Sequence, residues 1–208
     1  MHQFLRVCLF GLLAVVLTMS RLSTPPEVRG RELPAPAFDV VITNARIVDG
    51  SGNPWFRADV GIRDGRIVRV GRINPGAGKK VIDAKDQILA PGFIDVHTHV
   101  ESIYSQPAAE NFIRMGVTSL VTGNCGTSAT EVAEFLARAK QQPIGVNLAT
   151  LIAHGSVRRK VTGLVDRDPT PDEMRSMEAL VEQGMKDGAV GLSTGLIYVP
   201  GTFAKTDE

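Results

Sequence analysis

The stretch that decides the fold is Pro91-Gly92-Phe93-Ile94-Asp95-Val96-His97-Thr98-His99, an apolar run that ends in two histidines two positions apart. Side chains at positions i and i+2 of a β-strand point to the same side of a sheet, so both imidazoles can face one site. Paired imidazoles suit zinc and similar divalent ions. If the strand belongs to a parallel barrel, its end lies at the mouth, where such folds carry their active sites. The stretch therefore predicts a metal site.

Two further side chains fit this site. Asp95 shares the face of His97 and His99 by strand parity, so its carboxylate can orient an imidazole from behind the metal ligands. Cys125 follows the next predicted strand in a glycine-rich turn, and a thiolate there is a strong zinc ligand. The alternatives are a solvent-facing carboxylate for Asp95 and a small buried hydrophobic side chain for Cys125.

Downstream of residue 88 the chain alternates between predicted strands and predicted helices. The strands are buried-looking runs, as parallel strands covered on both faces should be. This alternation predicts an α/β fold in which residues 90–208 form the first four βα units of an incomplete TIM barrel, a (β/α)8 fold. The strands lie near residues 89–96, 118–122, 145–152 and 190–194.

Two of the intervening helices have recognisable starts. Ser128 and Glu131 form a capping box ahead of apolar residues at helical spacing. Thr170 and Glu173 form a second box, with Pro171 at the first helical position. Another helix is expected to begin near residue 107, where a proline fits the first turn, and to end near residue 116.

Residues 38–89 are rich in predicted β-strands and form a separate small domain. Asp64-Gly65 stands between two runs of alternating hydrophobicity, which is a strong hairpin signal. Residues 24–37 are rich in Pro, Arg and Glu and have no apolar period, so they are predicted to be a linker.

Residues 1–23 are predicted to be a signal peptide. Arg6 precedes an apolar segment at residues 7–19 that is too short for a confident membrane span. We therefore expect an exported protein, periplasmic or secreted after cleavage, with an uncleaved membrane anchor as the alternative. Cys8 lies in this segment, which leaves Cys125 as the single cysteine of the mature chain and excludes an intrachain disulfide.

The composition limits the possible partners. The chain has 208 residues, a net charge of +1 and 22% charged residues, which offers no electrostatic footprint for nucleic acid. Beyond the signal segment nothing predicts a membrane partner, and the oligomeric state stays open. The one basic cluster, Arg158-Arg159-Lys160, is predicted to be a loop surface. With 43% hydrophobic residues the chain can build a core.

Four stretches resemble the amidohydrolase superfamily of metal-dependent hydrolases and, within it, the D-aminoacylase branch of N-acyl-D-amino-acid deacylases. The first stretch resembles the superfamily as a whole, and the order and spacing of all four resemble the branch. The resemblance implies that residues 38–89 are the small β-sandwich domain that precedes the barrel. The stretches are residues 91–99, Gly123-Asn124-Cys125-Gly126, His154-Gly155-Ser156-Val157-Arg158 and residues 188–201.

This resemblance implies a zinc-dependent enzyme with one or two ions that hydrolyses the amide bond of N-acyl-D-amino acids. It implies that His97, His99 and Cys125 are metal ligands. It places Tyr198 near the bound substrate, where its hydroxyl can donate to a developing oxyanion. The branch takes further histidine ligands and its catalytic aspartate from later strands, so the general base is expected beyond Glu208.

Two other residues have open roles. The planar guanidinium of Arg158 suits the carboxylate of an N-acyl amino acid, with a solvated loop position as the alternative. His154 is expected in the loop after the third strand, as a structural or substrate-loop residue. Val100-Glu101 stands where the branch commonly has an acidic pair, which puts loop contacts and substrate choice in doubt.

Two competing interpretations remain. One is another amidohydrolase that acts on cyclic amides; such enzymes usually carry a carboxylated lysine on strand four, and residues 190–196 contain no lysine. The other is a non-catalytic truncated product, because four strands do not close a barrel and the general base is missing. On either reading we expect the 208-residue chain alone to be inactive.

Overall fold

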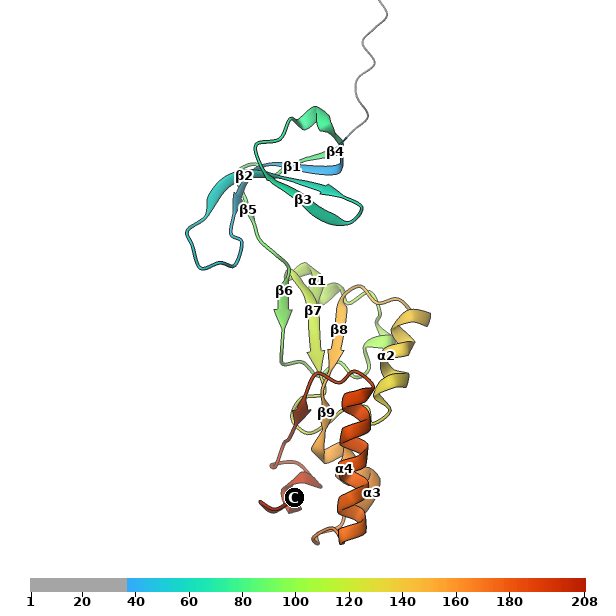
Figure 1. Ribbon diagram of the computed structural model, residues 1–208. Coiled ribbons are helices and arrows are strands. Elements are labelled where there is room, and N and C mark those ends of the chain that lie inside the picture. Colours follow the sequence, from blue (N-terminus) through green and yellow to red (C-terminus); the bar gives the residue numbers. More distant parts are fainter. Residues whose placement is uncertain (1–36) are drawn as a thin grey trace, which may run out of the picture. The chain divides into compact units, whose positions relative to one another are not determined.

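The computed structural model describes residues 37–208, which divide into two compact units (Figure 1). The first unit contains residues 37–46 and Phe56–Ile88, and the second contains Ile47–Trp55 and Leu89–Glu208. The predicted signal peptide and nearly all of the predicted linker lie outside the described residues. Within residues 37–208, none of the helices combines the length and the apolar character that crossing a bilayer requires.

The first unit is built on one hydrogen-bonded sheet with the order β3-β2-β1-β4, in which β5 also pairs with β1. The predicted hairpin is confirmed: β2 and β3 are antiparallel, and Asp64 and Gly65 have φ of 52° and 70°. The region for which the sequence predicts a β-sandwich thus contains a single branched sheet. Its strands are β1 (Phe38–Ile47), β2 (Phe56–Arg63), β3 (Arg66–Gly71), β4 (Gly78–Asp83) and β5 (Ile88–Leu89).

The second unit carries parallel strands in chain order with helices between them, as predicted (Figure 1). Strands β6, β7 and β8 form one parallel sheet, and β9 and β10 form a parallel pair. The sheets do not close, so the unit is a partial barrel. The elements are β6 (Phe93–Asp95), α1 (Glu110–Arg114), β7 (Val117–Thr122), α2 (Val132–Gln141), β8 (Asn147–Thr150), β9 (Ile152–Ala153), α3 (His154–Thr162), α4 (Pro171–Lys186) and β10 (Leu192–Ser193).

The two predicted capping boxes have different outcomes. At α4, the Thr170 hydroxyl accepts from the Glu173 N–H and the Glu173 carboxylate accepts from the Thr170 N–H, so this box is confirmed. At α2 the prediction is wrong, because the helix begins only after Glu131 and no side chain caps it. The Ser128 hydroxyl instead donates to the Ala129 carbonyl and accepts from the Ala153 N–H. A tertiary partner has replaced the local one.

The first helix and three of the four predicted strands are shorter than predicted, whereas β7 contains the whole predicted strand at residues 118–122. The predicted strand at residues 145–152 is divided into β8 and β9, and α1 begins at Glu110 and not near residue 107. Gly116 follows α1 with φ of 79°, which matches its predicted place at the helix end.

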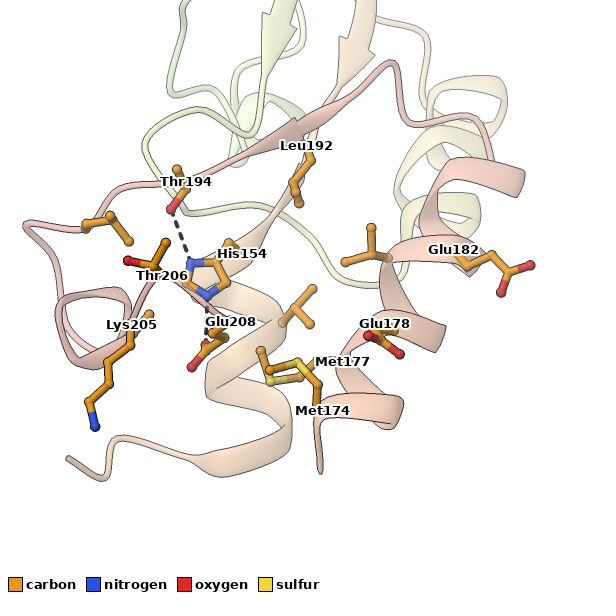
Figure 2. A pocket seen from close by; sticks show the side chains of 14 residues that line it. His154, Met174, Met177, Glu178, Glu182, Leu192, Thr194, Lys205, Thr206 and Glu208 are labelled. Carbon is orange, nitrogen blue, oxygen red and sulfur yellow. Dashed lines mark hydrogen bonds and ion pairs between the residues drawn. The ribbon is translucent and has the colours of Figure 1, made fainter. Parts of the chain in front are cut away.

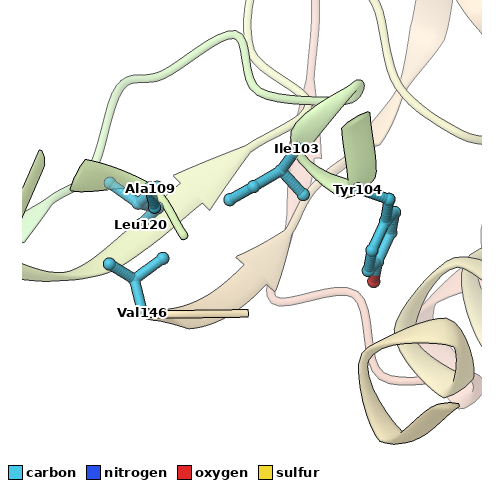
Figure 3. Close-up of a cluster of buried hydrophobic side chains, with 5 residues drawn as sticks. All are labelled: Ile103, Tyr104, Ala109, Leu120 and Val146. Atoms are coloured by element: carbon cyan, nitrogen blue, oxygen red, sulfur yellow. The ribbon is translucent and has the colours of Figure 1, made fainter. Parts of the chain in front are cut away.

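Two clusters of buried apolar side chains hold the second unit together. Figure 3 shows one cluster, in which Leu120 of β7 lies near Ala109 and Val146; Ile103 and Tyr104, from a short 3-10 helix at Ile103–Ser105, complete it. The Tyr104 hydroxyl donates to the Phe135 carbonyl at 2.6 Å, and burial raises the pKa of this tyrosine. The other cluster joins α2, α3 and α4 to β9 and consists of Val132, Ile152, Val157, Met177 and Ala189.

Candidate metal centre

The segment that follows β6 carries two histidines. Strand β6 ends at Asp95, one residue before the predicted strand end, and His97 and His99 lie just beyond it. Thr98 between them is only 6% exposed, and both its N–H and its hydroxyl donate to the Val121 carbonyl, at 3.1 and 2.8 Å. With Thr98 anchored in this way, the two histidines beside it are exposed and their rings lie close to each other.

Cys125 lies in the turn after β7, in a conformation that is uncommon for a residue with a side chain. Its φ is 54°, and Gly123 and Gly126 on either side have φ of 85° and 80°. A Cβ on Gly123 would stand 2.5 Å from the Leu151 carbonyl oxygen. The glycines of the Gly-Asn-Cys-Gly stretch therefore permit a tight turn that aims the thiol back toward the histidines.

The three predicted metal ligands converge. One ligand atom from each of His97, His99 and Cys125 can be chosen so that all lie within 4.8 Å of one another. His97 Nε2 is 3.3 Å from Cys125 Sγ, and the two imidazole rings have centroids 5.7 Å apart at an interplanar angle of 70°. Two imidazoles and a thiolate form a donor set that fits zinc.

Asp95 makes one side-chain contact close to the site, and its predicted role behind the metal ligands stays a prediction. Its Oδ1 accepts from the backbone N–H of His97 at 3.1 Å, so the carboxylate fixes the backbone at the strand end. The strand parity that would align Asp95 with the imidazoles stops at β6, which ends at Asp95 itself.

Sequence reasoning missed the polar side chains that connect the loops of the site. Glu101 Oε1 accepts from the Thr122 hydroxyl at 2.8 Å and from the Gly123 N–H at 3.0 Å. Asn124 is 8% exposed, and its amide donates to the Thr98 carbonyl of the histidine segment and to the Val121 carbonyl of β7. The position of Asn124 beside Cys125 was the one available signal, because a buried amide needs hydrogen-bond partners.

His154 lies beside Glu208 in a second group of ionisable side chains (Figure 2), and Arg158 belongs to this group through its ion pair with Glu208. His154 is the first residue of α3, not a loop residue, and its Nδ1 and Nε2 lie 3.2 Å from Thr194 Oγ1 and 2.9 Å from Glu208 Oε1. Arg158 is 0% exposed, forms an ion pair with Glu208 and donates to the Arg167 carbonyl at 2.7 Å.

The prediction of a loop surface for Arg158 is therefore wrong, because α3 turns this side chain inward while its basic neighbours face outward. Its substrate role stays a prediction, and that role would require the Glu208 carboxylate to leave. Tyr198 is 55% exposed, and its backbone N–H donates to the Gly195 carbonyl at 3.1 Å. Its predicted contact with substrate also stays a prediction.

The cavity next to α3 and α4 does not coincide with the predicted metal ligands. It has a volume of about 590 Å³ and lies among α3, α4 and the C-terminal segment, with His154 and Glu208 in its wall (Figure 2). A smaller cavity of about 300 Å³ is lined by His99 together with Ile103 and Phe112. Zinc is held by a few convergent ligand atoms. The candidate metal centre is therefore identified by its donor atoms and not by the volume of a cavity.

Comparisons with known proteins agree with this geometry. The sequence matches the amidohydrolase family over residues 80–206 and the N-terminal domain of the urease alpha subunit over residues 26–91. A D-aminoacylase from Alcaligenes xylosoxydans xylosoxydans is 32% identical over 82% of this chain and 40% of its own length. An N-acyl-D-aspartate deacylase from the same organism is 34% identical over 85% of this chain and 40% of its own length.

Solved structures give the same picture. N-acyl-D-glutamate deacylase from Bordetella bronchiseptica, in complex with zinc and a phosphonate mimic of the tetrahedral intermediate, has a TM-score of 0.78 at 34% identity, covering 81% of this chain and 40% of that chain. A D-aminoacylase described as having a binuclear metal centre has a TM-score of 0.78 at 31% identity, covering 82% of this chain and 41% of that chain.

The chain thus spans about two fifths of the length of these relatives. The family match itself covers more than half of the sequence and includes all three convergent ligands. On this evidence the chain belongs to the amidohydrolase family.

Proposed function

We propose that this chain is part of a zinc-dependent hydrolase of N-acyl-D-amino acids and supplies metal ligands to its active site. The observation that carries the proposal is the convergence of His97, His99 and Cys125, within 4.8 Å, from two loops that follow neighbouring parallel strands. The similarity to relatives named for deacylation of D-amino acids supports the substrate class.

The residues of this chain have distinct tasks in such a reaction. When bound, zinc polarises a carbonyl oxygen and lowers the pKa of water. His97, His99 and Cys125 would hold it, with either one or two ions at the full site. The hydroxyl of Tyr198 would donate to the oxyanion that forms as the amide is attacked. The proton acceptor is a residue that the family resemblance expects beyond Glu208.

A second candidate, a hydrolase of cyclic amides, has less support. The run at residues 190–196 contains no lysine to be carboxylated between two metals. The residue types at hand are instead two imidazoles and a thiolate that already share one site.

Zinc binding tests the proposal directly. We expect the 208-residue chain to bind zinc, and Cys125→Ala or His97→Ala to weaken binding by more than about a hundredfold, because even changes behind the ligands cost ten- to a hundredfold. His154→Gln is the matched control, since His154 lies outside the cluster, and it should leave zinc affinity unchanged. Undiminished affinity in Cys125→Ala would refute the site.

A test of the substrate class requires a protein that contains this chain together with the remaining catalytic residues. We expect this protein to hydrolyse N-acetyl-D-amino acids. We expect N-acetyl-L-amino acids and hydantoins to be hydrolysed much more slowly. Preferred turnover of a hydantoin would favour the cyclic-amide candidate.

We also propose that residues 1–23 direct export. The support is the single arginine ahead of a short apolar segment. N-terminal sequencing of protein from the periplasm or the medium should begin after this segment, whereas a soluble cytoplasmic protein that begins at Met1 would contradict it.

A further inference from the structure

We infer that Asn124 is a positioning residue that sets the distance between the Cys125 thiolate and the two histidines. The inference rests on the proposed metal site and adds a residue that holds the site together without binding metal. Three observations carry it: the hydrogen bonds of the amide, its burial, and the constrained backbone on either side.

The amide of Asn124 ties the two ligand-bearing loops to each other. Its Nδ2 lies 3.3 Å from the Thr98 carbonyl and 3.5 Å from the Val96 carbonyl, the two residues that flank His97. The same nitrogen is 3.1 Å from the Val121 carbonyl. All three partners are acceptors, so only the NH2 end of the amide can occupy this place.

The Val121 carbonyl is the group that also anchors Thr98. It accepts from the Thr98 N–H at 3.1 Å and from the Thr98 hydroxyl at 2.8 Å. The histidine segment and the Asn124 amide thus converge on one carbonyl at the end of β7. Because Asn124 directly precedes Cys125, a shift of this amide would move the thiol relative to both imidazoles.

The turn that follows is held from its other side by two more elements. The Ser193 hydroxyl of β10 donates to the Gly123 carbonyl, and its oxygen accepts from the Gly126 N–H at 3.3 Å. The Gly126 carbonyl accepts from the Ser156 N–H at 3.0 Å at the start of α3. These bonds fix the turn itself, whereas Asn124 supplies side-chain bonds that connect the turn to the histidine segment.

This arrangement gives Asn124 a definite function. Zinc affinity depends on ligands that are already placed before the ion arrives. With 8% exposure, the amide is protected from competing water, so its hydrogen bonds can hold the loops in register. Loss of the NH2 group would leave three carbonyls without this donor and free the thiolate to move away from His97.

The test is a cobalt and zinc titration of the 208-residue chain and its variants. Asn124→Ala and Asn124→Leu, the latter similar in shape but without a donor, should weaken zinc binding by about ten- to a hundredfold. In both variants, the thiolate-to-cobalt charge-transfer absorption in the near ultraviolet should be lower per bound cobalt ion than in the parent chain. Asn147→Ala is the matched control: its Nδ2 also joins adjacent strands, bonding to the Thr118 carbonyl at 3.0 Å, and it should leave both readouts unchanged.

Circular dichroism separates positioning from simple loss of structure. Folded Asn124 variants that bind zinc as the parent chain does, with full thiolate absorption per cobalt, would overturn the inference while leaving the metal site intact. A parent chain that binds no metal through Cys125 would instead refute the proposed function itself.

If both Asn124 variants are unfolded, Glu101 provides the second test, because its carboxylate holds Thr122 and Gly123 just before Asn124. Glu101→Gln keeps an accepting oxygen and should retain zinc affinity, whereas Glu101→Ala should lower it and weaken the thiolate absorption. Equal zinc affinity in these two variants would overturn the inference.

Discussion

Two groups of ionisable side chains in the second unit have opposite characters. His97 and His99 are exposed, and with Cys125 they converge without a carboxylate partner in the contacts of the described residues. His154 and Arg158 instead share the carboxylate of Glu208, and both Arg158 and Glu208 are almost completely buried. The first group has donor atoms available for a ligand, and the second has most of its own satisfied within the chain.

The difference teaches how to tell a site from a structural network when both contain histidine. A buried charge is expensive unless it is paired and hydrogen-bonded, so partners within the chain indicate a structural role. Convergent donors that lack such partners indicate a ligand. His154 adjoins the larger cavity, yet its two ring nitrogens are already engaged.

The largest expected effect comes from breaking the buried group. Arg158→Met leaves the Glu208 carboxylate without its guanidinium partner, and removing one partner of a buried pair typically costs about 3–5 kcal/mol. Urea denaturation should show this loss of stability while zinc affinity stays unchanged. Arg159→Met, one residue along α3 and with only a 3.3 Å bond from its guanidinium to the Val199 carbonyl, should cost less than about 1 kcal/mol. A large loss of zinc affinity in Arg158→Met would abolish the distinction between the two groups.

A second change tests how tightly the turn that contains Cys125 is packed. A Cβ on Gly195 would stand 2.1 Å from the Cys125 carbonyl oxygen, so Gly195→Ala must displace that turn. We expect a destabilisation of about 1–3 kcal/mol, as overpacking typically causes, together with weaker zinc binding. At Gly191 the nearest atom is a flexible leucine methyl at 3.2 Å, and Gly191→Ala should have little effect on zinc. Equal zinc affinity in the two variants would show that the Cys125 turn can shift without affecting metal binding, which would contradict this prediction.

A smaller effect is expected at the start of α4, next to the buried group. Thr170→Ala removes the N-cap hydroxyl and should lower stability by about 1 kcal/mol. Ser176→Ala, which removes a hydroxyl bonded to the Asp172 carbonyl inside the same helix, is the control and should change stability by less than about 0.5 kcal/mol. Thermal unfolding of the two variants side by side provides the measurement, and a larger shift for Ser176→Ala would contradict the cap.

The smallest effect concerns pH. The ion pair with Arg167, together with the Thr170 N–H, lowers the pKa of Glu173 from 4.5 to about 2. A carboxylate with a depressed pKa in the folded state stabilises the fold above the pKa of the unfolded chain and loses that contribution as pH falls. The contribution of Glu173 should therefore disappear between about pH 4.5 and pH 2.

Because Arg167 also accepts from Arg158 through its carbonyl, this loss should loosen the buried group. Glu173→Gln should unfold with a weaker dependence on pH in that window. An identical acid transition in the parent chain and in Glu173→Gln would rule the effect out.

Much of the fold and of the candidate metal site was predictable from local patterns. Asp64-Gly65 predicts its hairpin, and Thr170 with Glu173 predicts the start of α4, because each signal is satisfied by residues a few positions apart. Ser128 fails as a cap because its hydroxyl finds the Ala153 N–H, 25 positions away in the chain, which no local pattern reveals. Arg158 fails as a surface residue because burial depends on what packs against α3.

The sequence by itself determined the side chains that could bind a metal and the order of the strands that position them. His97 and His99 are spaced for one side, and Cys125 follows the next strand, so parallel pairing brings them together. Only the tertiary structure decided which polar groups are already satisfied. The amide of Asn124 donates to Val96, and the guanidinium of Arg158 pairs with Glu208; both partners are far away in the sequence. Such partners come close only after the loops and helices have packed.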